Sequence, residues 1–349
     1  MADLEKAPIS VNERAYKIVE EMISRAEELG VKVTVMPCGA LGIDCGIKAR
    51  GSVEAGLYVT RITLGDLAQV SLKTIDYDCF CLPAVHVSTD HPALATLGVQ
   101  LGDWEMWIQD TSVIGSGPAR ALAPNRPLPR AVATKKDAYK KKGYTITTPG
   151  DIYRKIGYRD LSNLAVIVLE TSVFPPDELF VAIAKQCGVD PKNLYGIIVP
   201  TSSIAGSVQI AGRVVEVGIH KVTLLGFDPT KILFGSGYAP IAPVHPDSSQ
   251  AMGRTNDSIR YGGVAFYIAD SDDKTLKGIV REVPSSVSRD YMKSFGEVFR
   301  SARHGFYDID LGIFAPAVIT INNFKTGNVF SAGKVNVPAL KRALSVHMY

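Results

Sequence analysis

The stretch VNERAYKIVEEMISRAEELGVKVTVM, from Val11 to Met36, joins a predicted helix directly to a predicted strand. Apolar residues recur in its first part at helical spacing between acidic and basic ones, and Gly30 ends that pattern. These apolar positions are Ala15, Ile18, Val19, Met22, Ile23 and Ala26. Val31–Met36 then has the character of a strand. Because an amphipathic helix must bury its apolar stripe, this unit favours a fold in which helices pack on a sheet.

The rest of the chain alternates between the same two patterns. Strands are predicted at Val70–Ile75, Ala84–Ser88, Leu164–Leu169, Tyr195–Val199, Ile232–Phe234 and Ala317–Asn322. Helices are predicted at Pro92–Leu97, Pro176–Cys187, Ile204–Val217, Asp247–Arg260, Ser288–Ala302 and Pro338–Val346. Val53–Leu67 forms a further element of undetermined type, and no repeat of solenoid length occurs. The sequence therefore predicts a mixed sheet packed by helices.

Length and composition exclude several classes of protein. The 349 residues are enough for two domains or one large α/β unit, and a hydrophobic share of 46% excludes wholesale disorder. A net charge of +3 gives no support for nucleic-acid binding, and no apolar run is long enough to span a membrane. The amino terminus lacks the pattern of a secretion signal. Five irregularly spaced cysteines fit a reducing compartment, so we expect a cytoplasmic protein: Cys38, Cys45, Cys79, Cys81 and Cys187.

A basic segment rich in proline and lysine stands apart at residues 121–150. Its part from Ala121 to Gly143, ALAPNRPLPRAVATKKDAYKKKG, carries a charge of +6, which leaves −3 for the rest of the chain. The prolines favour an insertion in the form of a surface loop, or a linker between lobes. A sharper hypothesis is that the lysines guide an anionic ligand to the protein.

Three polar residues share one face of the predicted helix Ile204–Val217, which is otherwise largely apolar. Gln209, Arg213 and Glu216 follow one another at spacings of four and three residues. An ion pair that satisfies only itself would explain two of them, because such pairs are common on helices. Alternatively, a partly desolvated glutamate beside an arginine can accept a proton from water.

Other motifs point to a site less specifically. Gly115–Arg120 and Gly235–Gly237 are predicted to form tight turns, and neither completes a dinucleotide-binding or phosphate-binding motif. Arg254–Ser258 is predicted to cap a helix or to line a pocket. Four potential metal ligands match no established zinc pattern, so we expect no metal: Cys79, Cys81, His86 and His91.

Ordered motifs along nearly the whole chain resemble one family. They are Ser10–Glu13, Asp44–Gly46, Gly51–Gly56, Thr89–Pro92, Leu97–Gln100, Gly115–Leu122, Pro200–Ile210, Gly212–Glu216, Gly253–Asp257 and Phe314–Pro316. With these motifs the sequence is similar to methenyltetrahydromethanopterin cyclohydrolases of archaeal and methylotrophic one-carbon metabolism. The resemblance implies conversion of the cationic 5,10-methenyl carrier and water into the 5-formyl carrier and a proton. It also implies that neither a metal nor a cofactor takes part, since the tetrahydromethanopterin derivative is itself the substrate.

The resemblance also implies roles for individual residues. Glu216 is the expected general base, and Arg213 orients the site and favours the ionised form of that carboxylate. Substrate-binding positions are expected at Gln100, Leu101, Gly102, Ser116, Gln209, Thr255, Asn256 and Asp257.

The architecture that the resemblance implies is α+β. Residues 1–349 are expected to form one family unit of two lobes, with the active-site pocket between the lobes and a homotrimeric assembly. The basic segment departs from the shorter connection of related sequences. Two alternatives remain open, namely a pterin-binding protein without turnover and a metal-dependent amidohydrolase.

Overall fold

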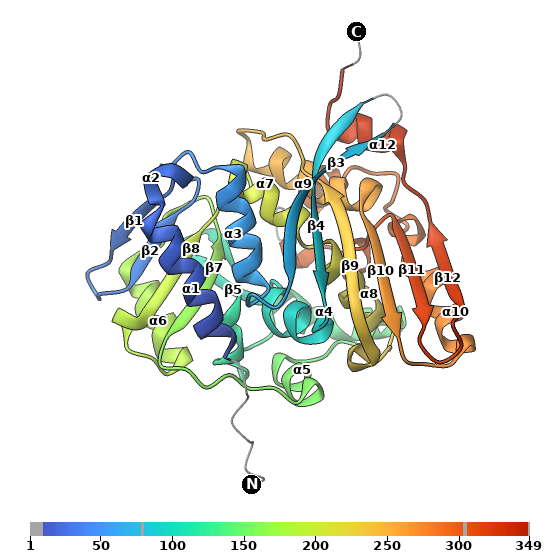
Figure 1. Cartoon of the computed structure of the whole chain (residues 1–349), viewed down its shortest axis with the longest axis horizontal. Helices are drawn as coiled ribbons and strands as arrows, with labels where there is room; N and C mark the ends of the chain where they lie inside the picture. The colour runs from blue at the N-terminus through green and yellow to red at the C-terminus, as the bar shows by residue number, and fades with distance from the viewer. Residues whose placement is uncertain (1–9, 78–79, 303–305, 348–349) are drawn as a thin grey trace. The chain divides into compact units, whose positions relative to one another are not determined.

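The computed structural model describes residues 10–77, 80–302 and 306–347, and the chain divides into two compact units. Unit 1 contains Met1–Leu67, Leu94–Pro129 and Thr147–Gly206, and unit 2 contains Ala68–Ala93, Arg130–Ile146 and Ser207–Tyr349. Within the described residues, each unit holds its own six-stranded mixed sheet (Figure 1). The predicted α+β class with two lobes is therefore confirmed.

The sheet of unit 1 has the strand order β1-β2-β8-β7-β6-β5, in which β2, β8 and β7 run parallel and the other pairs are antiparallel. Its strands are β1 (Lys32–Val35), β2 (Leu41–Asp44), β5 (Trp104–Ile108), β6 (Thr111–Ser116), β7 (Ala165–Glu170) and β8 (Leu194–Ile198). Its helices are α1 (Val11–Ser24), α2 (Ala26–Leu29), α3 (Val53–Thr63), α5 (Pro149–Ile156), α6 (Asp177–Cys187), the π-helix η1 (Leu94–Gln100) and the 3-10 turns η2 (Pro118–Ala121) and η3 (Pro191–Asn193).

The central strand β7 shows why this sheet is covered on both faces. Val166 and Val168 pack into a core with residues of α1 and α3, whereas Ile167 and Leu169 pack into a second core with residues of α6. Because successive residues of a strand point to opposite faces, a continuous apolar run is what such a strand requires.

The sheet of unit 2 has the order β12-β11-β10-β9-β4-β3, and only the β10–β11 pair is parallel. Its strands are β3 (Gln69–Asp76), β4 (Cys81–Thr89), β9 (Ile232–Pro240), β10 (Val264–Ala269), β11 (Val318–Asn323) and β12 (Val329–Gly333). Its helices are α4 (Arg130–Lys141), α8 (Val214–Leu224), α9 (Ser248–Gly262), α10 (Asp273–Glu282), α11 (Phe295–Ser301), α12 (Val337–Ala343) and the 3-10 turns η4 (Pro229–Lys231), η5 (Ser285–Val287), η6 (Phe306–Asp308) and η7 (Leu311–Ile313). The remaining helix, α7 (Ile204–Ala211), crosses the boundary between the units.

Several predicted elements differ from the observed ones. The predicted helix Ile204–Val217 is two helices, α7 and α8, because the chain breaks at Gly212 and Arg213. Within the predicted helix Ser288–Ala302, the helix begins only at Phe295, where Ser294 and Glu297 form a capping box. Gly235–Gly237 is not a turn but part of strand β9. Strands β2, β5, β6, β10 and β12 are not predicted by the sequence patterns, and the element Val53–Leu67, of undetermined type in the sequence, contains helix α3.

The basic segment is helical in its lysine-rich part, so the prediction of a loop is wrong for Arg130–Lys141. Pro124, Pro127 and Pro129 precede the helix, Pro149 follows it, and alanine and lysine are good helix formers. Val132 and Tyr139 are buried, so the helix also has an apolar side. None of the helices in the described part of the chain has the length and apolar character that a membrane span needs.

Candidate active site

The polar row of Gln209, Arg213 and Glu216, which the sequence predicts, lies at the break between α7 and α8. Arg213 precedes the first turn of α8, with φ −86° and ψ 1°. Its Nε donates to Oε1 of Gln209 over 3.3 Å, and its Nη1 lies 3.9 Å from Oε2 of Glu216. The three residues are therefore neighbours as predicted, although they belong to two helices. Glycine at 212 explains the break, since glycine is a poor helix former.

Burial makes this row unusual for charged groups. Arg213 is 8% exposed and Glu216 is 4% exposed, while Gln209 is fully buried. Glu216 lies in the first turn of α8, where the helix dipole favours a negative charge. A carboxylate with this support can take a proton from water or attract a cationic ligand.

Close packing between α8 and the sheet fixes the helix that carries Glu216. Tyr267 of β10 is fully buried, and its hydroxyl donates to the carbonyl of Val215 over 2.9 Å. Gly218 leaves room for that hydroxyl, because a Cβ there would lie 2.1 Å from it. Gly235 and Gly237 of β9 would bring a Cβ to 3.0 Å and 3.3 Å from valine side chains of α8. The glycines of β9 thus serve helix packing and do not form a ligand turn.

The far end of α8 is anchored by the basic segment. Lys221 is 3% exposed, and its Nζ donates to the carbonyl of Gly312 over 3.1 Å and to the hydroxyl of Tyr144 over 3.3 Å. Burial lowers the pKa of Lys221, against the raising effect of nearby acidic residues. The amide of Thr145 donates to the last carbonyl of the helix, that of Leu224, over 2.6 Å. Residues 144–145 therefore cap α8 within unit 2.

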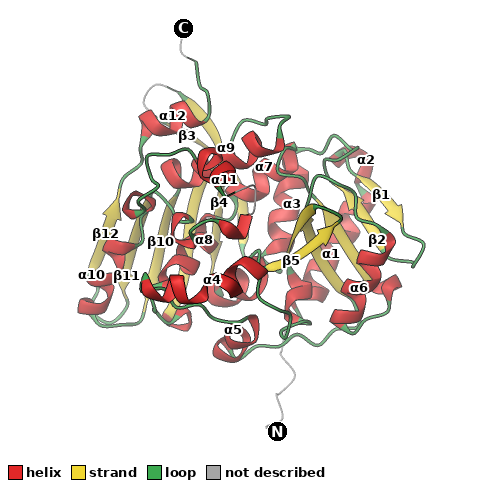
Figure 2. Ribbon diagram, turned by 180° about the vertical axis from the view of Figure 1, so that it is seen from behind, coloured by secondary structure: helices red, strands yellow, loops and turns green. Residues whose placement is uncertain are grey.

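Thr255, Asn256 and Asp257 lie on α9 (Figure 2), and both α9 and α8 contact β9. The side chains of Thr255 and Asn256 bond to carbonyls of the preceding turn of their own helix. Asp257 is 2% exposed, pairs with Arg260 and accepts from the amide of Phe295 over 3.0 Å. Asp257 therefore ties α9 to α11, and its predicted contact with substrate stays a prediction.

The remaining predicted binding residues belong to unit 1. Gln100 ends the π-helix η1, is fully buried and donates from Nε2 to Oγ1 of Thr63 over 3.1 Å. Leu101 and Gly102 follow it and are half-buried, and Ser116, 1% exposed, ends strand β6. The structure thus places two predicted binding segments in this unit and the predicted catalytic pair in unit 2.

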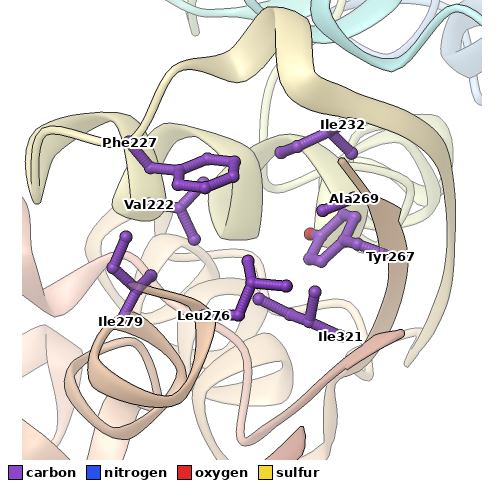
Figure 3. Close-up of a pocket in the computed structure, with 8 residues that line it drawn as sticks. All are labelled: Val222, Phe227, Ile232, Tyr267, Ala269, Leu276, Ile279 and Ile321. Atoms are coloured by element: carbon purple, nitrogen blue, oxygen red, sulfur yellow. The ribbon is translucent and has the colours of Figure 1, made fainter. Parts of the chain in front are cut away.

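An apolar cavity beside α8 is separate from these polar groups. Figure 3 shows its lining, which comprises Val222, Phe227, Ile232, Tyr267, Ala269, Leu276, Ile279 and Ile321. The space is too narrow to admit water and offers no charged side chain. It is a packing gap of the core.

The structure also bears on the metal ligands that the sequence suggested. Within the described residues, no group of three or more histidine, cysteine, aspartate or glutamate side chains is arranged to hold a metal. His86 bonds through Nε2 to Oγ of Ser236 over 3.0 Å, and Cys79 lies outside the described residues.

Comparison with known proteins gives one consistent answer. A family model described as cyclohydrolase (MCH) matches residues 10–148 and 142–344. The chain belongs to this family. It is 42% identical over 340 residues to the methenyltetrahydromethanopterin cyclohydrolase of Methanocaldococcus jannaschii, covering 96% of this chain and 98% of that protein. It is 41% identical over 343 residues to the enzyme of the same name from Methanothermobacter marburgensis, covering 97% of this chain and all of that protein.

Sequence reasoning missed the residues that support the row. Tyr267 and Lys221, which hold α8, gave no motif signal, and in unit 1 neither Asp103 nor Arg120 was assigned a role of its own. A buried charge within an otherwise small-residue motif is the signal that could have found Arg120.

Proposed function

We propose that this protein is a methenyltetrahydromethanopterin cyclohydrolase, which interconverts the 5,10-methenyl carrier plus water and the 5-formyl carrier plus a proton. The observation that carries the proposal is the nearly buried Glu216 beside Arg213 at the start of α8, in a chain of the cyclohydrolase family. The full-length relatives with this name support the choice of substrate.

The reaction needs the chemistry that this row supplies. Water adds to the electron-poor carbon between two nitrogens while Glu216 accepts one of its protons. The bond from that carbon to one nitrogen then breaks, that nitrogen gains a proton, and the oxygen loses its remaining proton to become the formyl carbonyl. One proton is released overall. The carboxylate also attracts the cationic substrate, and Arg213 holds the carboxylate in place while Gln209 holds Arg213.

The test replaces Glu216 with glutamine and follows the loss of absorbance of the methenyl carrier. Glu216→Gln keeps the size of the side chain but cannot accept the proton, so kcat falls by about 10²–10⁴-fold. Glu27→Gln, on the exposed surface of α2, is the matched control and retains the wild-type rate. An unchanged rate in Glu216→Gln removes this residue as the base.

Measurements of bound metal, substrate binding and turnover separate this function from its alternatives. Bound metal is quantified, and turnover is measured before and after chelation. A stoichiometric metal that is essential for turnover would favour an amidohydrolase mechanism. Substrate binding without any turnover would indicate a pterin-binding protein, and substantial turnover of the folate form would contradict the proposed specificity.

We also propose a homotrimer in the cytoplasm. Within unit 2, α8 and α10 lie on one face of the sheet, and Figure 1 shows strands β9 and β10 facing the viewer on the other side. On β10 the buried residues alternate with half-exposed Val264, Phe266 and Ile268, which supports a partner on that face. Light scattering should give three times the chain mass of 37.6 kDa, and a monomer would refute the assembly.

The proposed location in the cytoplasm is supported by the free thiols of Cys38, Cys45, Cys81 and Cys187, which fit a reducing compartment. Cell fractionation tests this location.

A further inference from the structure

A buried cluster of three charged residues, Asp103, Arg120 and Arg126, lies next to the Leu101–Gly102 turn in unit 1. Asp103 accepts from Nε of Arg120 over 2.7 Å and from Nη2 of Arg126 over 2.7 Å and 3.0 Å. Both arginine side chains are fully buried. Burying three charges is costly unless each has partners, so the cluster calls for an explanation.

The cluster closes the end of the π-helix η1. The amide of Leu101 donates to the carbonyl of Thr96 over 2.9 Å, a separation of five residues. At the end of a helix the last carbonyls need partners from outside that helix. Nη1 of Arg120 donates to the carbonyls of Leu97 over 3.1 Å and Gly98 over 2.9 Å, and the hydroxyl of Tyr153 donates to the latter over 2.5 Å.

The same contacts bring together two segments that lie apart in sequence. Arg120 belongs to η2, directly after strand β6 and Ser116. The amide of Gly117 donates to the carbonyl of Val99 over 2.9 Å. Arg126 extends the support, since its Nη1 donates to the carbonyl of Arg120 over 2.9 Å. The end of η1 and the end of β6 are thus held as one body.

We propose that Asp103, Arg120 and Arg126 form a clamp that positions the Gln100–Gly102 turn for binding the substrate. This inference rests on the proposed function. The clamp residues are positioning residues. Arg120 binds two carbonyls of the helix end and the carboxylate of Asp103, the residue after the turn. Arg126 binds the same carboxylate and the carbonyl of Arg120. Leu101 and Gly102 are half-buried, so this part of the turn is accessible to a ligand.

The geometry of the clamp requires guanidinium groups. Arg120 reaches a carboxylate and two carbonyls at once, which the single ammonium group of a lysine cannot match. Arg120→Lys therefore keeps the charge but loosens the turn. Interactions that bind substrate and transition state equally are expressed in KM, so we expect KM to rise about tenfold or more with kcat within about threefold of wild type.

The test compares Arg120→Lys and Tyr153→Phe with the control Arg61→Lys. Arg61 pairs with Asp66 over 3.0 Å on the surface of the same unit, so its variant retains the wild-type KM. Tyr153→Phe removes one hydroxyl and leaves the charges intact, so it gives a smaller rise in KM even if Arg120→Lys folds poorly. Hydrogen exchange of the amides at 96–103 is measured in the same variants. We expect their exchange to become faster than in wild type, and by a larger factor than that of amides in the strands of unit 1.

The outcomes separate positioning from mere stability. A higher KM together with faster exchange at 96–103 supports the clamp. A lower melting temperature with unchanged KM in both variants overturns it, as does a loss confined to kcat. If wild-type protein does not turn over the methenyl carrier, the proposed function fails, and unchanged exchange at 96–103 in Arg120→Lys would then separately overturn the clamp.

Discussion

Gly218 allows a sharp test of how α8 is held against the sheet. A Cβ at this position would lie 2.1 Å from the hydroxyl oxygen of Tyr267 and 3.1 Å from its Cζ. Because Tyr267 is fully buried, its ring can yield only by disturbing its neighbours. Overpacking costs about 1–3 kcal/mol, and loss of the hydrogen bond to Val215 costs about 1–3 kcal/mol. Alanine returns about 1 kcal/mol of helix propensity, so Gly218→Ala should lower the free energy of unfolding by about 1–5 kcal/mol.

The control is Gly278→Ala in α10, where a Cβ would meet no atom within 4 Å. This variant should be about 1 kcal/mol more stable than wild type, because alanine is the better helix former. Urea titration measures both variants, and a Tyr267→Phe background removes the atom nearest to the new Cβ. The cost of Gly218→Ala should be about 1–3 kcal/mol smaller in that background. Equal stability of the two alanine variants, or an equal cost in both backgrounds, would refute the reasoning.

Two further predictions concern charge. Burial would raise the pKa of Asp103, but Arg120 and Arg126 outweigh burial and lower it to about 2. A lowered folded-state pKa stabilises the fold above about pH 4, and this contribution of about 2 kcal/mol is lost as the pH falls towards 2. In urea titrations across that range, Asp103→Asn should lose about 2 kcal/mol less than wild type, and an equal loss would contradict this account. In the basic segment, neutralising the exposed Lys136, Lys140 and Lys141 should raise KM a few-fold at low salt and flatten its salt dependence. Unchanged kinetics would assign these lysines to solubility or assembly.

The structure narrows the hypothesis that the basic segment guides an anionic ligand. Lys135 pairs with Asp308 over 2.8 Å and Lys142 pairs with Asp310 over 2.6 Å, while the hydroxyl of Tyr139 donates to the carbonyl of Ile309 over 2.8 Å. These contacts dock α4 on residues 308–310. The net charge of the segment therefore overstates what a ligand would meet at its surface.

Patterns with a fixed local period were predictable from the sequence. The spacing of α1 and the apolar run of β7 each report their own burial, because helices and strands repeat every 3.6 and 2 residues. The spacing of Arg213 and Glu216 likewise placed them together, since residues three apart are neighbours in a helical turn. The family, too, could be identified from ordered motifs.

Tertiary structure alone decided how distant residues meet. The partners of Lys135 and Lys142 lie about 170 residues away in the sequence, and the hydroxyl that requires glycine at 218 comes from another element. Arg126, which the sequence predicts to lie in a basic surface segment, is buried and pairs with Asp103. Local patterns do not encode such contacts, because they depend on which surfaces pack together. The sequence by itself thus determined the family, many of the helices and strands, and the proximity of Arg213 and Glu216, and packing decided which buried charges and glycines hold neighbouring elements together.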